Sequence, residues 1–441
     1  MRALRLRPSA TPLAAASIAV VTAAALTACG AGSRTGAETA AEVPCDVEVD
    51  SPTTVNVLAY NSSAIDPFTN AMVRSCSQGD LTVEHEPIDF AGQTQRTTAT
   101  LAGETGTYDV LETYGYIIPQ LAADESLVPL DDLVDTYGDE YDLGELNEGM
   151  REAMSYDGQL YAVPMQAQMF LLAYRQDVFD ELGLEPPTTF DELREVSQTI
   201  QDAGDFAYPL ALPWLASGDI TTSYDAALGS LGVDYVDPET MTPNFDTPEA
   251  AQALEEMKSL VPYMDPQVTT FDQPAVQQQM YNGDAAMAIM FSGRMSDLAN
   301  EDNTQYAADF GFAPPPSVEE GGPQFSALSV DGWSIPANSA VDPDTLFQVI
   351  ATSVSEEASE AALPAAYPAR DGVADDSDSP IVEAASEAID NAPPAEPFPW
   401  TAPISNDTRD VIAQVVLGQT SVEDAVVQMQ QIATDDLAQY S

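Results

Sequence analysis

The sequence predicts an α/β fold that is divided into two lobes. Apolar, strand-like runs alternate with helix-like segments along most of the chain, a pattern typical of sheets covered by helices. After the N-terminal segment described below, roughly 410 residues remain, which is too many for one hydrophobic core. In such α/β sheets, ligands bind at the carboxyl ends of the strands. The loops that follow the strands are therefore the first place to look for a site.

The first 28 residues read as a secretory signal. Three arginines precede an uncharged, Ala-rich run that is too short and too weakly apolar to be read as a membrane span. The small residues before Cys29 fit a bacterial lipobox, in which the cysteine is acylated; an ordinary signal with a chance cysteine is the alternative. We expect a signal peptide over 1–28 and a lipid-anchored, flexible tether over 29–50, with the protein held on the extracellular face of the cell membrane.

Two cysteines remain once Cys29 is assigned to the lipid. An even remainder in an exported chain suggests a disulfide between Cys45 and Cys76. Closing a loop of this size would stabilise the fold by roughly 3–4 kcal/mol in the chain-entropy model. Two cysteines cannot build a metal cluster, and no CxxC occurs, so we expect neither a metal nor a cofactor.

The charge balance excludes one class of partner. Against 72 acidic residues stand 13 basic ones, giving a formal net charge of −59. Nucleic acid binding is excluded, because neutralising phosphates needs a basic stripe that this chain lacks. The acids read as a solvated surface. A calcium-binding surface is the other interpretation, but the nearest approach to a ligand-spaced loop, Asp375-Asp376-Ser377-Asp378, stops at Pro380.

The elements follow one another as strand and helix from residue 53 onward. Strands are expected over 53–60, 81–86 and 108–111, and helices over 67–74, 93–102 and 117–123. This alternation predicts parallel sheets. The stretch from 375 to 399, rich in acids and prolines, looks the least ordered.

The segment from 161 to 193 (YAVPMQAQMFLLAYRQDVFDELGLEPPTTFDEL) carries the most local information. Two apolar runs are separated by Pro164 and Gln168, and a helix over 177–182 follows, which Gly183 should end in the left-handed conformation. Thr189 should cap the next helix, with a capping box to Glu192.

The order strand, Pro, strand, Tyr, short helix, Gly-Leu, Pro-Pro and capped helix resembles the extracellular solute-binding protein family 1, the maltose-binding-like proteins of ABC importers. Further likenesses are FDTPEAAQAL from 245 and NGDAAM from 282. The resemblance runs from about residue 55 to the C-terminus. It implies a periplasmic-binding-protein-like fold with a hinge and a ligand cleft between lobes. Lobe 1 would comprise 51–165 and 331–372, and lobe 2 would comprise 166–330 and 373–441.

The resemblance also implies a ligand-binding set. Aromatic faces would cover the apolar side of a sugar ring and polar groups would meet its hydroxyls. Compared residue by residue, the positions are Tyr60, Asn61, Glu112, Tyr114, Gln168, Trp214, Arg294, Asp331 and Trp333. Arg294 stands where related sugar binders carry an aromatic. It either pairs with one of the many acids, or it grips sugar hydroxyls or a carboxylate such as that of a uronic acid.

The resemblance implies a monomeric binding lipoprotein that closes on a sugar or oligosaccharide and delivers it to the permease subunits of an ABC importer. No motif of a hydrolase, protease or nucleotide-binding enzyme is present, and His85, the single histidine, reads as structural. Two alternatives stay open: a surface-anchored, glycan-active enzyme or lyase, and a sensor or adhesion module that uses the same fold without transport.

Overall fold

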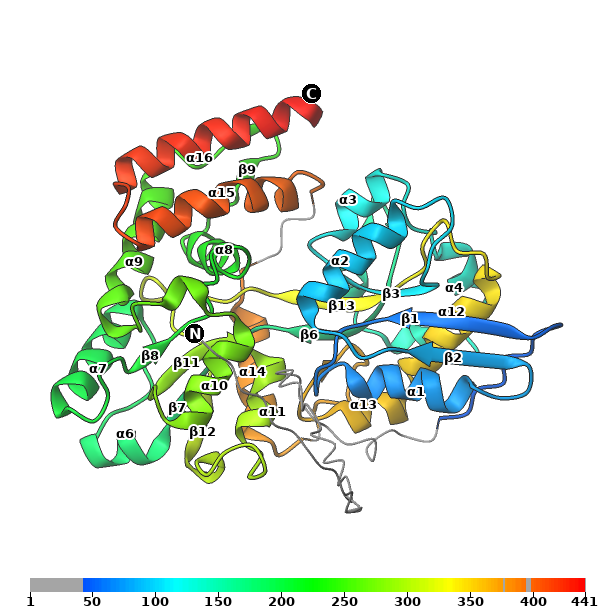
Figure 1. Ribbon diagram of the computed structural model, residues 1–441, viewed down its shortest axis with the longest axis horizontal. Coiled ribbons are helices and arrows are strands. Elements are labelled where there is room, and N and C mark those ends of the chain that lie inside the picture. Colours follow the sequence, from blue (N-terminus) through cyan, green and yellow to red (C-terminus); the bar gives the residue numbers. More distant parts are fainter. Residues whose placement is uncertain (1–42, 376, 394–397, 441) are drawn as a thin grey trace, which may run out of the picture. The chain divides into compact units, whose positions relative to one another are not determined.

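The structure is a computed structural model that describes residues 43–375, 377–393 and 398–440 (Figure 1). Two main sheets carry the fold. The first has the order β14 (Tyr367–Pro368), β6 (Val163–Gln168), β13 (Ser329–Ser334), β3 (Val110–Tyr114), β1 (Thr53–Leu58) and β2 (Leu81–His85). The second has the order β12 (Phe310–Ala313), β7 (Phe170–Arg175), β11 (Met287–Phe291) and β8 (Leu210–Ala211).

Helices account for most of the remaining chain. They are α1 (Asp66–Cys76), α2 (Phe90–Leu101), α3 (Ile118–Ala123), α4 (Asp131–Tyr137), α5 (Glu148–Ala153), α6 (Gln176–Leu182), α7 (Phe190–Ala203), α8 (Ile220–Ser230), α9 (Pro248–Leu260), α10 (Gln273–Asn282), α11 (Met295–Leu298), α12 (Pro343–Ser353), α13 (Glu356–Ala362), α14 (Pro380–Asn391), α15 (Thr401–Val416) and α16 (Val422–Leu437). Two hairpins, β4 (Ser155–Tyr156) with β5 (Gln159–Leu160) and β9 (Val236–Asp237) with β10 (Thr242–Pro243), and six short 3-10 helices complete the list.

The first sheet mixes strand directions. Strand β1 runs parallel to β2 and β3, as the alternation of strands and helices predicts, but β13 enters between β3 and β6 and is antiparallel to both. Figure 1 shows β13, in yellow, among strands from the first half of the chain. The prediction of a parallel sheet is wrong for the second sheet, in which only β11 and β8 run parallel.

The apolar run in β7 has a clear physical reason. Every residue of this strand is buried, and alternate side chains enter different hydrophobic clusters: Leu171 and Ala173 in one, Phe170 and Leu172 in the other. Because side chains alternate between the two faces of a strand, burial of both faces demands a continuous apolar run. The chain passes from the first sheet to the second at Met169, just after the predicted lobe boundary.

The predicted helix ends agree with the structure in most details. Gly183 closes α6 in the left-handed conformation, and the Thr189 side chain accepts a hydrogen bond from the Glu192 amide at the start of α7. The capping box is wrong in one respect. The Glu192 carboxylate accepts from the amide of Thr188, at 2.7 Å, so it caps one residue earlier than expected.

Two segments are more ordered than the sequence suggested. The tether was expected to reach residue 50, yet Val43, Cys45 and Val47 are buried against the fold. The stretch from 375 to 399 contains helix α14, which begins at a Ser379 cap and buries an apolar face. Its acids lie mainly on the opposite face of the helix. The composition of the segment alone therefore does not reveal that the helix is amphipathic.

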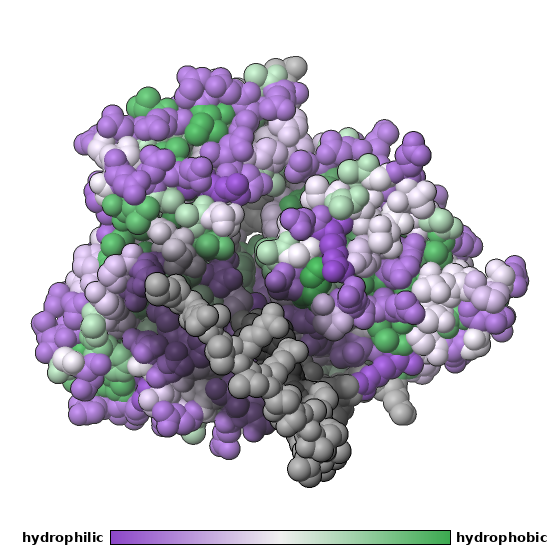
Figure 2. All heavy atoms as spheres, viewed as in Figure 1, coloured by the Kyte–Doolittle hydropathy of each residue, from purple (hydrophilic) through white to green (hydrophobic). Residues whose placement is uncertain are grey.

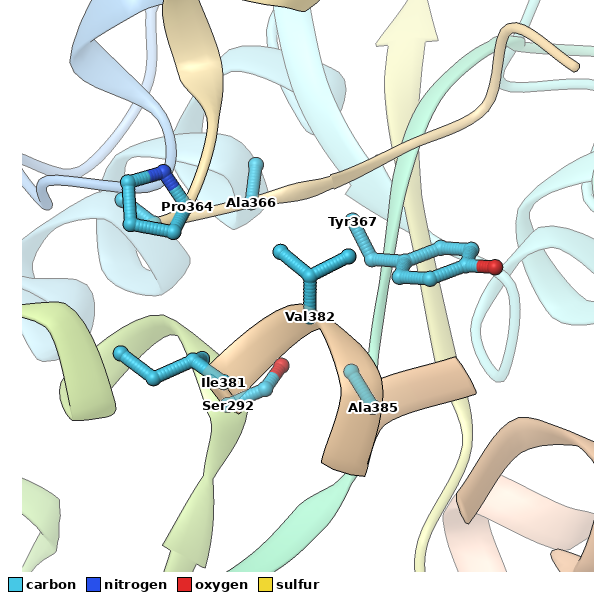
Figure 3. A pocket seen from close by; sticks show the side chains of 8 residues that line it. Ser292, Pro364, Ala366, Tyr367, Ile381, Val382 and Ala385 are labelled. Atoms are coloured by element: carbon cyan, nitrogen blue, oxygen red, sulfur yellow. The ribbon is translucent and has the colours of Figure 1, made fainter. Parts of the chain in front are cut away.

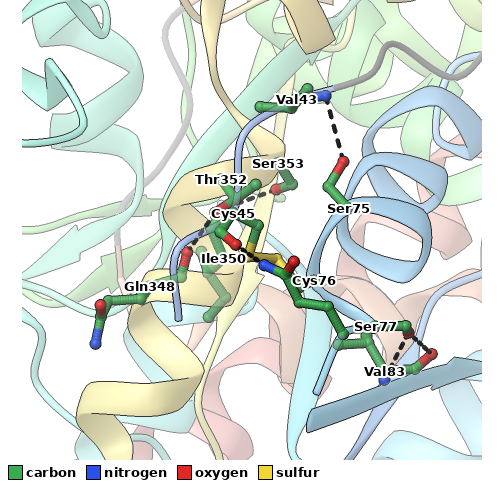
Figure 4. Close-up of a disulfide and its surroundings, with 11 residues drawn as sticks. Val43, Cys45, Ser75, Cys76, Ser77, Val83, Gln348, Ile350, Thr352 and Ser353 are labelled. Carbon is green, nitrogen blue, oxygen red and sulfur yellow. Dashed lines mark hydrogen bonds between the residues drawn. A yellow bond between two sulfur atoms is a disulfide. The ribbon is translucent and has the colours of Figure 1, made fainter. Parts of the chain in front are cut away.

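Cys45 and Cys76 are joined by a disulfide in the structure, with their Cα atoms 5.2 Å apart (Figure 4). It connects the segment before β1 to the last residue of α1. The side chain of Gln78 also donates a hydrogen bond to the Cys45 carbonyl, and the Val43 amide donates to Ser75. The signal peptide, Cys29 and residues 29–42 of the tether lie outside the described residues.

Candidate ligand-binding site

Four aromatic side chains meet where β1 and β3 end. Tyr60 lies two residues after β1, Tyr114 ends β3, and Phe90 begins α2. The Phe90 ring packs on Tyr60 and Tyr114 with centroids 5.5 and 5.7 Å away. Tyr116 stacks on Tyr114 at 5.6 Å with only 9° between the rings. Tyr60 and Tyr114 are buried, whereas Phe90 and Tyr116 stay 47% and 45% exposed. The group, called the aromatic cluster below, therefore presents apolar ring surface to solvent.

Two buried carboxylates lie on β3 and on its neighbour β13. Pairing of β13 with β3 sets Asp331 opposite Tyr114 and Trp333 opposite Glu112, so these side chains share one face of the sheet. Glu112 is 0% exposed and Asp331 1% exposed. The Glu112 Oε2 atom accepts a hydrogen bond from the Tyr60 amide at 3.0 Å, while its Oε1 atom has no partner among the described residues. Through this hydrogen bond, Glu112 connects β3 to the backbone that follows β1.

Asp331 is the better satisfied of the two acids. Its Oδ2 atom accepts from the amides of Gln168 and Gln166 at 2.6 and 3.1 Å, and its Oδ1 atom accepts from the Ser329 hydroxyl. Gln168 also donates to the Tyr60 hydroxyl at 3.4 Å. The amide of Gln168 thus links Asp331 to the aromatic cluster, and Gln166, which the sequence did not single out, braces the same carboxylate.

Burial dominates the ionisation of both acids. Desolvation, followed by the negative charge of Asp331, raises the pKa of Glu112 well above its usual range, although the Tyr60 amide and the nearby Tyr114 hydroxyl oppose this rise. Burial raises the pKa of Asp331 to about 6, and the hydrogen bonds from Gln168, Ser329 and Gln166 limit the change. Ionisation of Asp331 therefore makes ionisation of Glu112 less favourable.

Residues from the second sheet's side approach this cluster. The 3-10 helix η4 (Ser292–Arg294) follows β11, and the Ser63 hydroxyl donates to the Gly293 carbonyl at 3.2 Å. A Cβ atom on Gly293 would lie 2.8 Å from the Gln168 Oε1 atom and 3.0 Å from the Ala64 Cβ atom. Only glycine therefore allows this close approach between the turn after β11 and the loop after β1.

Arg294 makes no ion pair within 4.0 Å in the part of the chain that the structure describes, so the structure does not support its pairing with an acid. The charge of Arg294 instead lowers the pKa of groups on both sides of the site, Tyr60 and Asp219. Burial raises the pKa of the Tyr60 hydroxyl and raises that of Asp219 to about 6, and Arg294 offsets part of both shifts. Asp272 adds to the rise at Asp219 by repulsion. Arg294 is half-buried between these groups.

Tyr116 connects the two sides electrostatically. Burial of its hydroxyl raises its pKa, and the carboxylates of Asp331, Glu112 and Asp219 raise it further. The hydroxyl thus lies in the field of acids from both sides, although the ring remains exposed. An exposed ring with three acids around its hydroxyl suits a ligand that offers an apolar face and hydrogen-bond donors.

The structure does not bring all nine predicted residues to this surface. Trp214 and Trp333 are both fully buried, so neither ring offers a face to a ligand in this conformation. The amide of Asn61 is occupied locally, because it donates to Asp66 at 3.2 Å and accepts from the Ile88 amide at 2.7 Å. The six that do gather are Tyr60, Glu112, Tyr114, Gln168, Arg294 and Asp331.

Sequence reasoning missed four residues of the site: Phe90, Tyr116, Gln166 and Asp219. Tyr116 sits two positions after Tyr114 in ETYGY, and the alternation of side chains across an extended strand could have placed both rings on one face. Phe90, in contrast, carries no local signal, because its neighbours Asp89 and Ala91 read as an ordinary helix start. Its role depends on where α2 packs against the first sheet.

Two pockets elsewhere on the protein contain none of these residues. A small pocket, shown in Figure 3, is lined by Ser292 after β11, Pro364 to Tyr367 around β14, and Ile381, Val382 and Ala385 of α14. Another, beside the hairpin of β9 and β10, is lined by residues of 232–249 and includes three acids. The first is mostly apolar and offers few groups for recognising a polar ligand.

Metal and membrane signals are weak in the described residues. They contain no group of three or more histidine, cysteine, aspartate or glutamate side chains placed to hold a metal ion. Of the helices that the structure describes, none combines the length and the apolar character needed to cross a bilayer. The ring of His85 has a local hydrogen-bond partner, because its Nε2 atom lies 2.9 Å from the Ala59 carbonyl oxygen.

The family model described as "Bacterial extracellular solute-binding protein" matches residues 78–359 of this chain. The chain belongs to this family. Its members are binding proteins rather than enzymes. The match spans both main sheets and covers most of the residues discussed above, which agrees with the resemblance and confirms the two-lobed α/β fold.

Individual relatives are more distant. The maltotriose-binding protein of Pyrococcus abyssi is 32% identical over 174 residues, 39% of this chain and 34% of the relative. The mannitol-binding protein of Pseudomonas aeruginosa is 26% identical over 266 residues, 59% of each chain. The matched stretches thus span between a third and two thirds of these curated relatives. A solute-binding protein of Agrobacterium radiobacter, solved with ribitol, superposes with a TM-score of 0.78 at 20% identity over 88% of this chain and 100% of that one.

Proposed function

We propose that this protein captures a saccharide or polyol between its two lobes and delivers it to the permease subunits of an ABC importer. The observation that carries the proposal is the surface formed by Phe90, Tyr116 and the buried carboxylates behind them. Exposed aromatic rings at the carboxyl ends of strands, backed by acids and amides, provide the two things that a sugar requires: an apolar face and hydroxyl partners.

The relatives support a polyhydroxylated ligand. By their names they bind maltotriose and mannitol, and the ribitol complex has the same fold. These ligands differ in length and ring closure but share a dense array of hydroxyl groups. Glu112, Asp331 and the two glutamines supply acceptors and donors of the matching kind. Of the predicted set, we retain Tyr60, Glu112, Tyr114, Gln168, Arg294 and Asp331.

Capture would involve hinge rotation. The chain passes between the sheets at Met169, between β12 and β13, and after β14, and these connections can absorb the backbone changes of a closing motion. The contact between Ser63 and Gly293 would then form on closure, since it joins the loop after β1 to the turn after β11. Closing would bring Arg294 and Asp219 towards Tyr116.

A thermal-shift screen of the soluble protein against sugars and polyols tests the proposal. A ligand present at one hundred times its dissociation constant stabilises the folded state by about 2.7 kcal/mol, which gives a clear rise in melting temperature. We expect at least one saccharide or polyol to produce such a rise. A flat response across mono-, di- and trisaccharides and linear polyols would contradict the proposed function. Turnover of any of these compounds would favour the glycan-active enzyme instead.

The location is part of the same proposal. The lipobox at Cys29 and the family's extracellular role support a monomer tethered to the outer face of the cell membrane through acylation. The variant Cys29→Ser should leave the membrane fraction, or accumulate as unprocessed precursor. Normal processing with unchanged membrane retention would contradict lipid anchoring, while leaving the ligand proposal untouched.

A further inference from the structure

We infer that the ligand is a saccharide or polyol that carries a protonated amine, an amino sugar or aminated polyol, with the ammonium held near Glu112 and Asp331. The inference rests on the proposed function and narrows it to one chemical class. It depends on three features of the site: carboxylates without a cation, acceptor atoms without a donor, and an exposed aromatic face within the field of those carboxylates.

The charge balance is the first feature. Glu112 and Asp331 are almost completely buried, and none of the five ion pairs in the described residues involves either of them. Arg294 is a candidate for compensation, since its charge acts on Tyr60 and Asp219, but it makes no ion pair with either carboxylate in the described residues. Burial raises the pKa of both acids, as expected when no positive charge compensates their ionised forms, and an ammonium bound beside them would stabilise those ionised forms.

The hydrogen-bond balance is a second, independent feature. Gln166 is fully buried, and while its amide nitrogen donates to Asp331, its Oε1 atom has no partner. Glu112 Oε1 also has no direct partner among the described residues, although the nearby Tyr114 hydroxyl favours the ionised form of this carboxyl. The indole N–H of Trp333, on the same sheet face as Glu112, is also unpaired, but it is neutral and cannot compensate a carboxylate. An ammonium offers three donors together with the missing charge.

The aromatic face is the third feature. The Tyr116 ring is stacked on Tyr114 and remains 45% exposed, and its hydroxyl senses Asp331, Glu112 and Asp219 together. A cation near the face of a tyrosine is attracted by the ring, in addition to its attraction by the acids. A sugar ring that stacks on Tyr116 would therefore place a ring substituent close to the acids. A neutral hydroxyl gains only a hydrogen bond there, whereas an ammonium gains charge neutralisation as well.

The same features disfavour an anionic ligand such as a uronic acid. Arg294 could pair with one carboxylate, and it is free of ion pairs within the described part of the chain. However, the charges of Asp331, Glu112 and Asp219 all raise the pKa of the Tyr116 hydroxyl, and Asp272 adds to the charge around Asp219. One half-buried guanidinium does not offset this field, so repulsion would outweigh the single pair.

Matched sugar pairs test the inference. Isothermal titration at pH 7 would compare glucosamine with glucose, galactosamine with galactose, and the fully deacetylated chitosan disaccharide with cellobiose. N-acetylglucosamine and glucuronate serve as the uncharged and anionic members. We expect the amine of at least one pair to bind ten times more tightly than its neutral partner, about 1.4 kcal/mol. The advantage should shrink as salt concentration rises.

Two variants locate the ammonium. Glu112→Gln and Asp331→Asn should each reduce the preference for the amine at least tenfold, while changing affinity for the neutral partner less. Asp225→Asn removes a partly buried acid of α8 that lies outside the site and also has a raised pKa, and it should leave the preference intact. If neutral sugars or polyols bind and the amines gain nothing, or glucuronate binds best, the inference is overturned and the proposed function stands. If none of this panel binds, the inference is overturned, and the thermal-shift screen against trisaccharides and linear polyols decides the proposed function separately.

Discussion

Two clusters in this protein combine acids of raised pKa with tyrosines, and they differ in how exposed the aromatic rings are. In the first, Glu112 and Asp331 lie behind the rings of Tyr114 and Tyr116. In the second, Asp225 of α8 lies among Tyr224, Tyr235 and Phe245, whose rings pack within 4.9–6.2 Å of one another. Burial raises the pKa of Asp331 to about 6 and that of Asp225 to about 7, so ionisation alone does not distinguish the two clusters.

Exposure of the rings is what separates them. Tyr224, Tyr235 and Phe245 are at most 1% exposed, whereas Tyr116 and Phe90 keep almost half of their surface. In the second cluster the rings fill a core, and any ligand would have to displace them. In the first cluster Tyr116 and Phe90 keep exposed surface, so a ligand can contact their rings without displacing a core. A perturbed acid therefore indicates a binding site here only when it is combined with accessible recognition surface.

Figure 2 shows why surface polarity would not have revealed the difference. Hydrophilic residues cover much of the visible face, as expected of a chain with 72 acidic side chains, and apolar residues occur in scattered patches. With acids so common, one more acidic patch is uninformative. The buried minority of acids is informative, because each of them lost its hydration when the protein folded.

The largest effect is expected from replacing a tryptophan in the hydrophobic core that contains Tyr224. Trp214 follows β8, is 0% exposed and belongs to the same hydrophobic cluster as Tyr224. Trp214→Ala should lower the free energy of unfolding by about 3–5 kcal/mol, through lost burial and a cavity. Denaturant unfolding measures this change. Ligand affinity of the folded variant should stay within a factor of two, and a large loss of affinity without loss of stability would return Trp214 to the site.

A smaller effect is expected where the two sides approach. Gly293→Val would force its side chain against Gln168 and Ala64, and this should hold the lobes apart. We expect ligand affinity to fall by at least tenfold, about 1.4 kcal/mol, with little change in apo stability. Gly218→Val is the matched control, because no atom lies within 4 Å of its added Cβ. Equal affinities of the two variants would show that closure does not need this contact.

The pH dependence of stability compares the clusters directly. Asp331 and Asp225 have folded-state pKa values of about 6 and about 7, both above the roughly 3.9 of an unfolded aspartate. Their protonated forms therefore favour the fold, and this contribution is full below about pH 4 and is lost as pH rises through 6 and 7. Denaturant unfolding between pH 4 and 8 should show this loss, to which the raised pKa values of Glu112 and Asp219 add, and Asp225→Asn should remove the share of the loss near pH 7 that belongs to Asp225.

Adding ligand should separate the contributions of Asp331 and Asp225 to the pH dependence of stability. A saturating ligand that contacts Asp331 should change the pH dependence that remains in Asp225→Asn, because Asp331 then ionises against a partner. The difference between wild type and Asp225→Asn should be the same with and without ligand. A ligand-dependent change in that difference would show that the second cluster also takes part in binding.

The sequence predicted the framework better than the site. Caps and stops such as Gly183 and Thr189 act within one turn, so they can be read locally. The position of Asp331 beside Tyr114 depends on β13 entering between β3 and β6, a pairing across more than 200 residues that no local pattern encodes. Trp214 and Trp333 are buried for a related reason, since a tryptophan next to a predicted loop can point into the core as easily as out of it.

The central claim is that the exposed ring of Tyr116 belongs to the ligand-binding surface. The most direct measurement is isothermal titration of wild type and Tyr116→Ala with the sugar or polyol that gives the largest thermal shift. Stacking contributes roughly 0.5–1.5 kcal/mol beyond burial, so affinity should fall at least several-fold while the melting temperature without ligand stays nearly unchanged. Full affinity in Tyr116→Ala would contradict the assignment of the site to the aromatic cluster.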